Sequence, residues 1–172
     1  VNIASQFAQR SSLQGIVTGR QNELTPLNVD VRLRTEAGTA EILAEKPDVV
    51  IIATGGRPNV NDFAGSEYCQ SIWDGLTNAS RYIGSDVLIY DGLGQHQAPS
   101  CATHLVEAGA SVKFVALDER VAEEMGGSER VMHRKRFHQQ GIPVQTDLRI
   151  AEVMKNGDKL HATFVHELTD TH

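Results

Sequence analysis

The residues with the clearest potential for chemistry lie in two small turns, each of which follows a run of apolar residues. The runs are residues 49–52 and 87–90. The turns contain Ala53, Thr54 and Gly55 in the first case and Gly92 and Gly94 in the second. Turns without bulky side chains let the backbone approach a ligand closely, and a following helix N-terminus offers N–H groups to phosphate. The spacing predicts a protein that handles a dinucleotide.

The second turn is an imperfect version of the Gly-x-Gly-x-x-Gly fingerprint of dinucleotide-binding proteins. Gly92 and Gly94 keep the first spacing, whereas Ala98 stands one position beyond the place of the third glycine. Two interpretations stay open: the turn cradles a phosphate, or it only connects a strand to a helix in a Rossmann-type unit. An acidic residue at the end of the next strand usually holds the ribose hydroxyl. Asp118 comes late for this role, so NAD binding depends on whether Asp118 reaches the ribose.

A nucleophilic site near the second turn is a weaker alternative. Ser100 or Cys101 could act with His96 and Asp91, which lie close by in the sequence. The chain has no Gly-x-Ser-x-Gly elbow, however, and nothing in the sequence fixes the geometry of these four residues. We therefore predict no catalytic residue in the chain.

The histidines and cysteines do not predict a metal site. His133 and His138 are five positions apart, whereas two metal ligands on one helix face are three or four apart. We interpret this segment as a solvated basic face near a helix C-terminus. Cys69 and Cys101 are far apart and form no Cys-x-x-Cys pair for zinc or an iron–sulfur cluster.

The composition is that of an ordinary globular protein. The chain has 172 residues, of which 40% are hydrophobic, and a formal net charge of −6, which argues against a nucleic-acid partner. No apolar stretch approaches the roughly 18 residues that span a bilayer. Residues 1–6 lack the basic start of a signal peptide. Two cysteines are too few for a disulfide framework, so we expect a reduced, cytoplasmic protein.

The elements that precede the first turn are predicted to be one helical segment and three strands. Residues 1–27 are typical of helix, and Pro26 marks its end. Apolar and charged residues alternate over 28–35, which predicts a half-buried strand, with 40–44 as its short partner. Residues 49–52 are predicted to form a buried strand.

From residue 85 onward the pattern predicts a β-α-β unit. Residues 86–90 and 112–117 are expected to be parallel strands, joined by a helix over 99–108 with a right-handed crossover. A crossover of this kind is the basis of a Rossmann-like parallel sheet with flanking helices. We place a lobe boundary near residue 80.

The last part of the chain is predicted to add two helices, a third strand and a hairpin. Residues 120–125 are expected to form a short helix, and Ser128 is expected to cap the next helix, which runs to Gly141. Residues 142–144 are expected to form a third parallel strand. The dipeptide Asn156-Gly157 between two alternating runs is a strong β-hairpin signal.

Two segments resemble a known family. Residues 47–58 look like the Ala-Thr-Gly segment of flavoproteins with two dinucleotide folds. Residues 87–102, with Gln97, Ala98, Pro99 and Ser100 inside them, resemble the C-terminal region of trimethylamine dehydrogenase- and dimethylglycine demethylase-type members of the NADH:flavin oxidoreductase family. Further segments fit the same picture: Ser71, Ile72, Trp73, Asp74, Gly126, Gly141 and Ile142. The resemblance spans nearly the whole chain.

The resemblance implies a C-terminal fragment of a flavin-dependent oxidoreductase. Residues 1–80 would be the C-terminal part of an FAD- or ADP-type lobe, and residues 81–172 an NAD(P)-type Rossmann-like lobe. FMN and a [4Fe–4S] cluster would belong only to a barrel that this chain lacks. The implied cofactor-binding residues are Ala53, Thr54, Gly55, Gly92, Gly94 and Asp118. The implied partner is a small-molecule dinucleotide, with no membrane or nucleic acid, and the parent protein would be a homo-oligomer.

Three functional hypotheses follow. The first is a dinucleotide-binding-like region of an N-demethylase or amine dehydrogenase, inactive as an isolated fragment. The second is a non-catalytic structural or oligomerisation module with a degenerate nucleotide site. The third is a pyridine-nucleotide reductase of the ferredoxin- or disulfide-reductase type, which would normally show a cleaner glycine turn and often a redox Cys-x-x-Cys pair.

Overall fold

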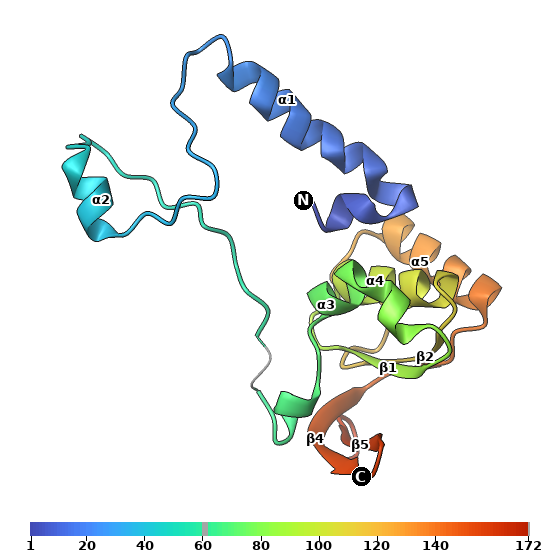
Figure 1. The fold of residues 1–172 in the computed structure, drawn as a ribbon. Helices are drawn as coiled ribbons and strands as arrows, with labels where there is room; N and C mark the ends of the chain where they lie inside the picture. Colours follow the sequence, from blue (N-terminus) through green and yellow to red (C-terminus); the bar gives the residue numbers. More distant parts are fainter. Residues whose placement is uncertain (60–61, 172) are drawn as a thin grey trace. The chain divides into compact units, whose positions relative to one another are not determined.

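The computed structural model describes residues 1–59 and 62–171 and divides the chain into two compact units, Val1–Arg57 and Pro58–His172. Figure 1 shows the helices of the first unit and the mixed helices and strands of the second. Nearly all buried apolar side chains among the described residues belong to the second unit, with Phe7 as the exception. The hydrophobic core therefore lies in the part of the chain that contains the second glycine turn.

The described residues of the first unit form helices and irregular segments. Its elements are η1 (Ala4–Gln6), η2 (Ala8–Leu13), α1 (Gln14–Leu24) and α2 (Thr39–Ala44). The predicted helical character of residues 1–27 is confirmed, although it is divided among three elements. No residue from 1 to 57 is assigned to a strand.

The three strands predicted in the first unit are wrong. Residues 40–44 lie in α2, and residues 28–35 and 49–52 have no regular secondary structure. Ile51 and Ile52 are 85% and 81% exposed. A strand needs a neighbouring strand to satisfy its backbone N–H and C=O groups, and no such neighbour is present among the described residues of this unit. The alternation of residues 28–35 and the apolar character of residues 49–52 were not sufficient to form strands.

The second unit contains the predicted parallel sheet. Its strands are β1 (Asp86–Asp91), β2 (Ser111–Ala116) and β3 (Val144–Gln145), in the spatial order β1-β2-β3, and both pairings are parallel. Helix α4 (Gln97–Glu107) connects β1 to β2, and α5 (Gly127–Gln140) connects β2 to β3. The predicted β-α-β unit is confirmed, and its fold class is α/β (Figure 1).

The core lies between the sheet and helices α4 and α5. Side chains alternate along a strand, so Ile89 and Asp91 of β1 face the same side as Phe114, which pairs in register with Ile89. Phe114 contacts Phe137 of α5 in an edge-to-face arrangement, with ring centroids 5.0 Å apart. From α4, Cys101, Ala102 and Leu105 are almost fully buried, as their helical spacing predicted.

The predicted hairpin contacts the opposite face of the sheet near the end of β1. Strands β4 (Leu148–Asn156) and β5 (Lys159–His166) pair antiparallel, and Gly157 with its φ of 61° begins the two-residue turn between them. The ring of Phe164 in β5 lies 6.0 Å from that of Tyr90 in β1. This contact attaches the hairpin to the sheet near the end of β1.

A short helix, α3 (Ile72–Thr77), precedes the sheet between η3 (Ser66–Tyr68) and η4 (Ala79–Tyr82). Ser71 and Asp74 form a capping box at its N-terminus, with Ser71 Oγ accepting from the Asp74 N–H at 3.2 Å. Gly75 of α3 lies against Cys101 of α4, where a Cβ atom would come within 2.8 Å of the sulfur. The lobe boundary near residue 80 stays a prediction.

Two details of the segment after β2 differ from the predictions. Residues 120–125 form turns rather than a helix, because Ala122 has a left-handed φ of 59° and the Glu124 N–H bonds the Gly94 carbonyl at 3.0 Å. Helix α5 begins at Gly127, with Gly126 rather than Ser128 at the cap position. It ends as predicted before Gly141, whose φ of 65° suits the left-handed C-terminal position.

Candidate functional site

The candidate site is the turn between β1 and α4, at the carboxyl edge of the parallel sheet. Ligands of open α/β sheets bind at this edge. Gly92 and Leu93 are exposed, whereas Gly94 is buried. The turn is therefore accessible at its tip and packed at its base.

Asp91, the last residue of β1, organises this turn. The residue is only 3% exposed. One carboxyl oxygen, Oδ1, accepts hydrogen bonds from the N–H groups of Leu93 at 3.1 Å and Gly94 at 3.0 Å. The other oxygen, Oδ2, is buried and has no hydrogen-bond partner among the described residues. An aspartate that bonds backbone N–H groups two and three residues ahead is a known turn-forming arrangement.

Gly94 is required by both its conformation and its surroundings. Its φ is +65°, in the left-handed region that favours glycine. A Cβ atom at Gly94 would lie 2.6 Å from Oδ2 of Asp118 and 3.3 Å from the backbone N of Glu124. Close packing against the loop after β2 thus explains why a glycine stands at this position.

The structure brings Asp118 next to the turn. Asp118 follows the end of β2, and its backbone C=O accepts a hydrogen bond from the Asp147 N–H at 3.2 Å. The predicted residues Gly92, Gly94 and Asp118 therefore gather at one edge of the sheet. Their assignment to cofactor binding stays a prediction.

The same edge carries several acidic groups that disfavour one another's ionisation. Burial raises the pKa of Asp91, and the Asp118 charge raises it further, against the two backbone hydrogen bonds. Burial also raises the pKa of Asp118, with additional contributions from Glu124 and Glu123. Glu123 is paired with Arg130 at 3.3 Å, but the carboxyl groups of Asp91, Asp118 and Glu124 still create a negative potential at this edge, which is unfavourable for an anionic ligand.

The N-terminus of α4 has fewer donors than a typical phosphate-binding helix. Gln97 is its first residue, and Pro99 in its first turn has no N–H. Ala98, which replaces the third glycine of the fingerprint one position late, is 4% exposed and packs in the core. His96 at the cap position lies 3.6 Å from Glu129 of α5, measured from Nε2 to Oε1.

The residues of this turn do not fit the pyrophosphate of NAD(P). A phosphate cradle needs backbone N–H groups that point at the ligand. Here the Leu93 and Gly94 N–H groups already donate to the Asp91 carboxylate. The imperfect glycine pattern is thus accompanied by the Asp91 carboxylate, which accepts the N–H groups that a bound phosphate would use.

The first turn lies in the other unit. Ala53, Thr54 and Gly55 are exposed and belong to a segment without regular structure. Gly55 has a φ of 75°, which suits glycine. The predicted role of these three residues beside a second nucleotide stays a prediction.

The structure gives no support to a nucleophilic site. Burial raises the pKa of Cys101 to about 12, so its thiol is not a thiolate at neutral pH. Ser100 is buried in α4, and Asp91 is occupied by the turn. Among the residues that the structure describes, no three His, Cys, Asp or Glu side chains form a group that could hold a metal ion.

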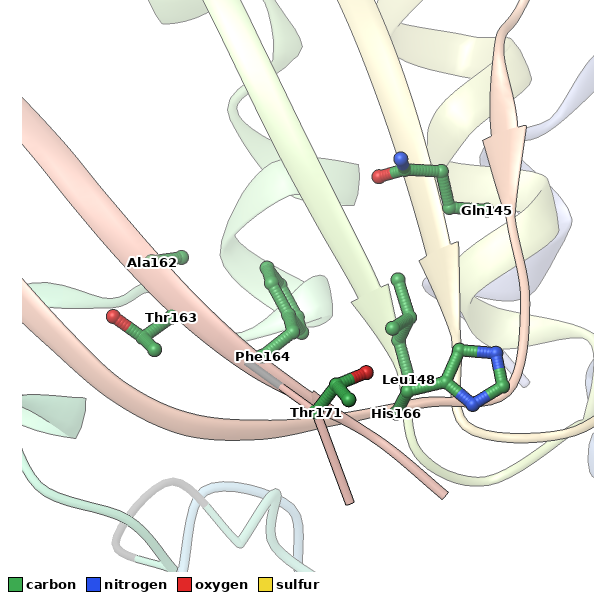
Figure 2. Close-up of a pocket in the computed structure, with 7 residues that line it drawn as sticks. All are labelled: Gln145, Leu148, Ala162, Thr163, Phe164, His166 and Thr171. Carbon is green, nitrogen blue, oxygen red and sulfur yellow. The ribbon is translucent and has the colours of Figure 1, made fainter. Parts of the chain in front are cut away.

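A pocket of about 450 Å³ lies at the hairpin, and its lining includes none of the residues predicted as a site. Figure 2 shows its lining, which combines apolar and polar side chains: Gln145, Leu148, Ala162, Thr163, Phe164, His166 and Thr171. The imidazole Nδ1 of His166 already accepts the Leu168 N–H at 3.2 Å. Alternation within a strand indicates which residues share a face, but it does not indicate that the face is hollow, so the sequence did not reveal this pocket.

Sequence reasoning also missed the hydrogen bonds of Asp91. The signal was present, because Asp followed by Gly-x-Gly at a strand end is typical of an Asx turn.

No described helix is long and apolar enough to cross a membrane.

Comparisons with known proteins agree with the fold. No protein-family model matches the chain. It is 38% identical over 170 residues to the multifunctional alkene reductase/demethylase OYE of Caballeronia cordobensis, covering 98% of this chain and 25% of that protein. It is 31% identical over 177 residues to the N,N-dimethylglycine/sarcosine dehydrogenase of Chromohalobacter salexigens, with the same two coverages.

A solved structure extends the similarity to three dimensions. Histamine dehydrogenase from Rhizobium sp. 4-9 superposes with a TM-score of 0.80 at 16% identity, over 99% of this chain and 28% of that one. At this identity the similarity shows the fold alone. The fold and the turn after β1 define a Rossmann-type lobe.

The chain thus matches the NADH:flavin oxidoreductase family that its sequence segments resemble. It spans about a quarter of the length of the curated relatives that it matches.

Proposed function

We propose that the chain is the C-terminal, dinucleotide-binding-like region of a flavin-dependent oxidoreductase and that it has no turnover of its own. The observation that carries this proposal is the parallel β1-α4-β2 unit, with its glycine turn at the carboxyl edge, in a chain whose relatives are named as reductases, demethylases and dehydrogenases. In such enzymes the flavin carries out hydride transfer. The chain contributes a folded lobe to the parent enzyme.

The names of the relatives suggest the chemistry of the parent protein. One is named a demethylase and another a dehydrogenase of N,N-dimethylglycine and sarcosine. We propose that the parent acts on a small N-methylated or other amine substrate. Contacts to that substrate would lie outside this chain. We also propose a cytoplasmic, homo-oligomeric parent.

Oxidation of NADH and NADPH tests the absence of turnover. The purified, flavin-free chain is mixed with each nucleotide, and absorbance at the nicotinamide band is followed with and without added FMN or FAD. We expect no oxidation above the rate of the free flavin, because hydride transfer belongs to the flavin and this chain would hold only part of a flavin-type lobe. The full-length parent, assayed in parallel, is the positive control. Oxidation by the flavin-free chain contradicts the proposal.

A structural role is the second candidate, and one observation favours it. The N–H groups that would hold a phosphate at the Gly92–Gly94 turn are bonded to the Asp91 carboxylate. A lobe whose cradle is filled by its own side chain can still pack against the rest of the enzyme.

A further inference from the structure

The Asp91 side chain accepts backbone N–H groups that an anionic ligand of this fold would be expected to use. In dinucleotide-binding lobes the glycine turn presents backbone N–H groups to the pyrophosphate. In this chain Oδ1 of Asp91 accepts two of these N–H groups, at 3.1 Å and 3.0 Å. The turn thus has a bound anion that is part of the polypeptide.

The second oxygen of the Asp91 carboxyl group is unfavourable for the stability of the fold. Oδ2 of Asp91 is buried and has no hydrogen-bond partner among the described residues. Leaving a buried acceptor without a partner is destabilising. The carboxylate thus holds the turn through Oδ1 and leaves a buried, unpaired oxygen at Oδ2.

We propose that Asp91 is the residue that excludes dinucleotide pyrophosphates from the turn of Gly92, Leu93 and Gly94. It does so by occupying the N–H donors and by placing a negative charge at the site. This inference rests on the proposed function, which assigns the lobe to the dinucleotide-binding-like region. Asp118 and Glu124, which lie against Gly94, add to the same repulsion.

Three variants of the full chain test the proposal. Asp91→Ala removes the charge and frees the two N–H groups. Asp91→Asn removes the charge but keeps an oxygen that can accept from them. Asp86→Asn is the matched control, because it removes one acidic charge at the exposed, opposite end of the same strand. Far-UV circular dichroism and thermal unfolding establish that each variant is folded.

Binding of ADP, NADH and NADPH to each protein is measured by calorimetric titration at low ionic strength. We expect the wild-type chain and Asp86→Asn to bind none of these nucleotides detectably. Asp91→Ala is expected to bind at least about tenfold more tightly than the wild type, since removing one charge within a few ångströms of a pyrophosphate is worth this much at a protein surface. Asp91→Asn is expected to fall between the two.

Two results overturn the inference. If the wild-type chain binds a nucleotide as tightly as folded Asp91→Ala does, Asp91 excludes nothing, and the lobe is a working nucleotide site. If neither binds, another feature closes the site. Should Asp91→Ala fail to fold, Asp91→Asn decides alone, and no gain over the wild type overturns the inference. The turnover assay above is independent of these titrations, so failure of the proposed function is recognised separately.

Discussion

At the scale of single residues, the carboxyl edge of the sheet depends on one aspartate and one glycine. Asp91 holds the turn through two backbone N–H groups, and Gly94 lets the turn approach Asp118 and Glu124. An apolar side chain in place of Asp91 would lose the two hydrogen bonds, and a side chain in place of Gly94 would obstruct the close approach. Two predictions belong to this scale.

Substitution of Gly94 by alanine is expected to destabilise the chain by about 2 kcal/mol, because it adds backbone strain at positive φ and a clash with Asp118. Thermal or urea-induced unfolding measures the change. Gly127→Ala is the control, since a Cβ atom there has no neighbour within 4 Å and Gly127 has no positive φ. Equal unfolding midpoints for the two variants would show that the turn relaxes without cost.

Stability is expected to depend on pH through Asp91. Burial raises its pKa in the folded chain above the ordinary value of 3.8, so the folded state binds the proton more tightly than the unfolded state. The contribution of this group is present below pH 3.8 and is lost as pH rises through the folded pKa. The stability of Asp91→Asn relative to wild type should therefore increase as pH rises from about 4 to 7. Urea unfolding at several pH values measures this difference, and a difference that stays constant or decreases with pH contradicts the prediction.

At the scale of elements, the second unit is stabilised where α5 packs on β2. Phe137 is 3% exposed and meets Phe114 edge to face. We expect Phe137→Ala to cost about 3–4 kcal/mol, from lost burial and the cavity that remains. Chemical unfolding measures the loss. Val131→Ala, at a position 58% exposed on the same helix, is the control and should change stability by less than about 0.5 kcal/mol. A small effect of Phe137→Ala would mean that the core collapses around the missing ring.

The apolar residues 49–52 are exposed, in contrast to the buried contact between α5 and β2. Exposed β-branched residues without a pairing strand promote association between chains. Ile51→Lys with Ile52→Lys is expected to reduce self-association several-fold, since like charges oppose edge pairing. Light scattering over a concentration series measures this. Val131→Lys, which replaces an exposed apolar side chain of helix α5, is the control. Equal association of both variants would show that another surface drives it.

At the scale of the whole molecule, the two units contribute unequally to the core. Phe7 is the single buried apolar side chain described in Val1–Arg57. A chain consisting of residues 58–172 should therefore fold and unfold within about 5 °C of the full chain, followed by circular dichroism. Loss of the cooperative transition on removing residues 1–57 would show that the first unit stabilises the second.

The sequence by itself determined the β-α-β unit, the parallel pairing of β1 with β2 and the hairpin at Asn156-Gly157. These features rest on local signals: apolar periodicity, glycine at helix ends and a two-residue turn. The family resemblance also came from short segments, and the relatives confirmed it.

Only the tertiary structure decided the state of the first unit and of the glycine turn. Residues 28–35 and 49–52 have the composition of strands, but a strand forms only where a neighbour supplies hydrogen bonds, and composition does not specify the neighbour. The spacing of Gly92 and Gly94 is compatible with an open phosphate cradle and with a filled one. The distances from the Asp91 carboxylate to the two N–H groups distinguish them, because each N–H donor can serve one strong acceptor.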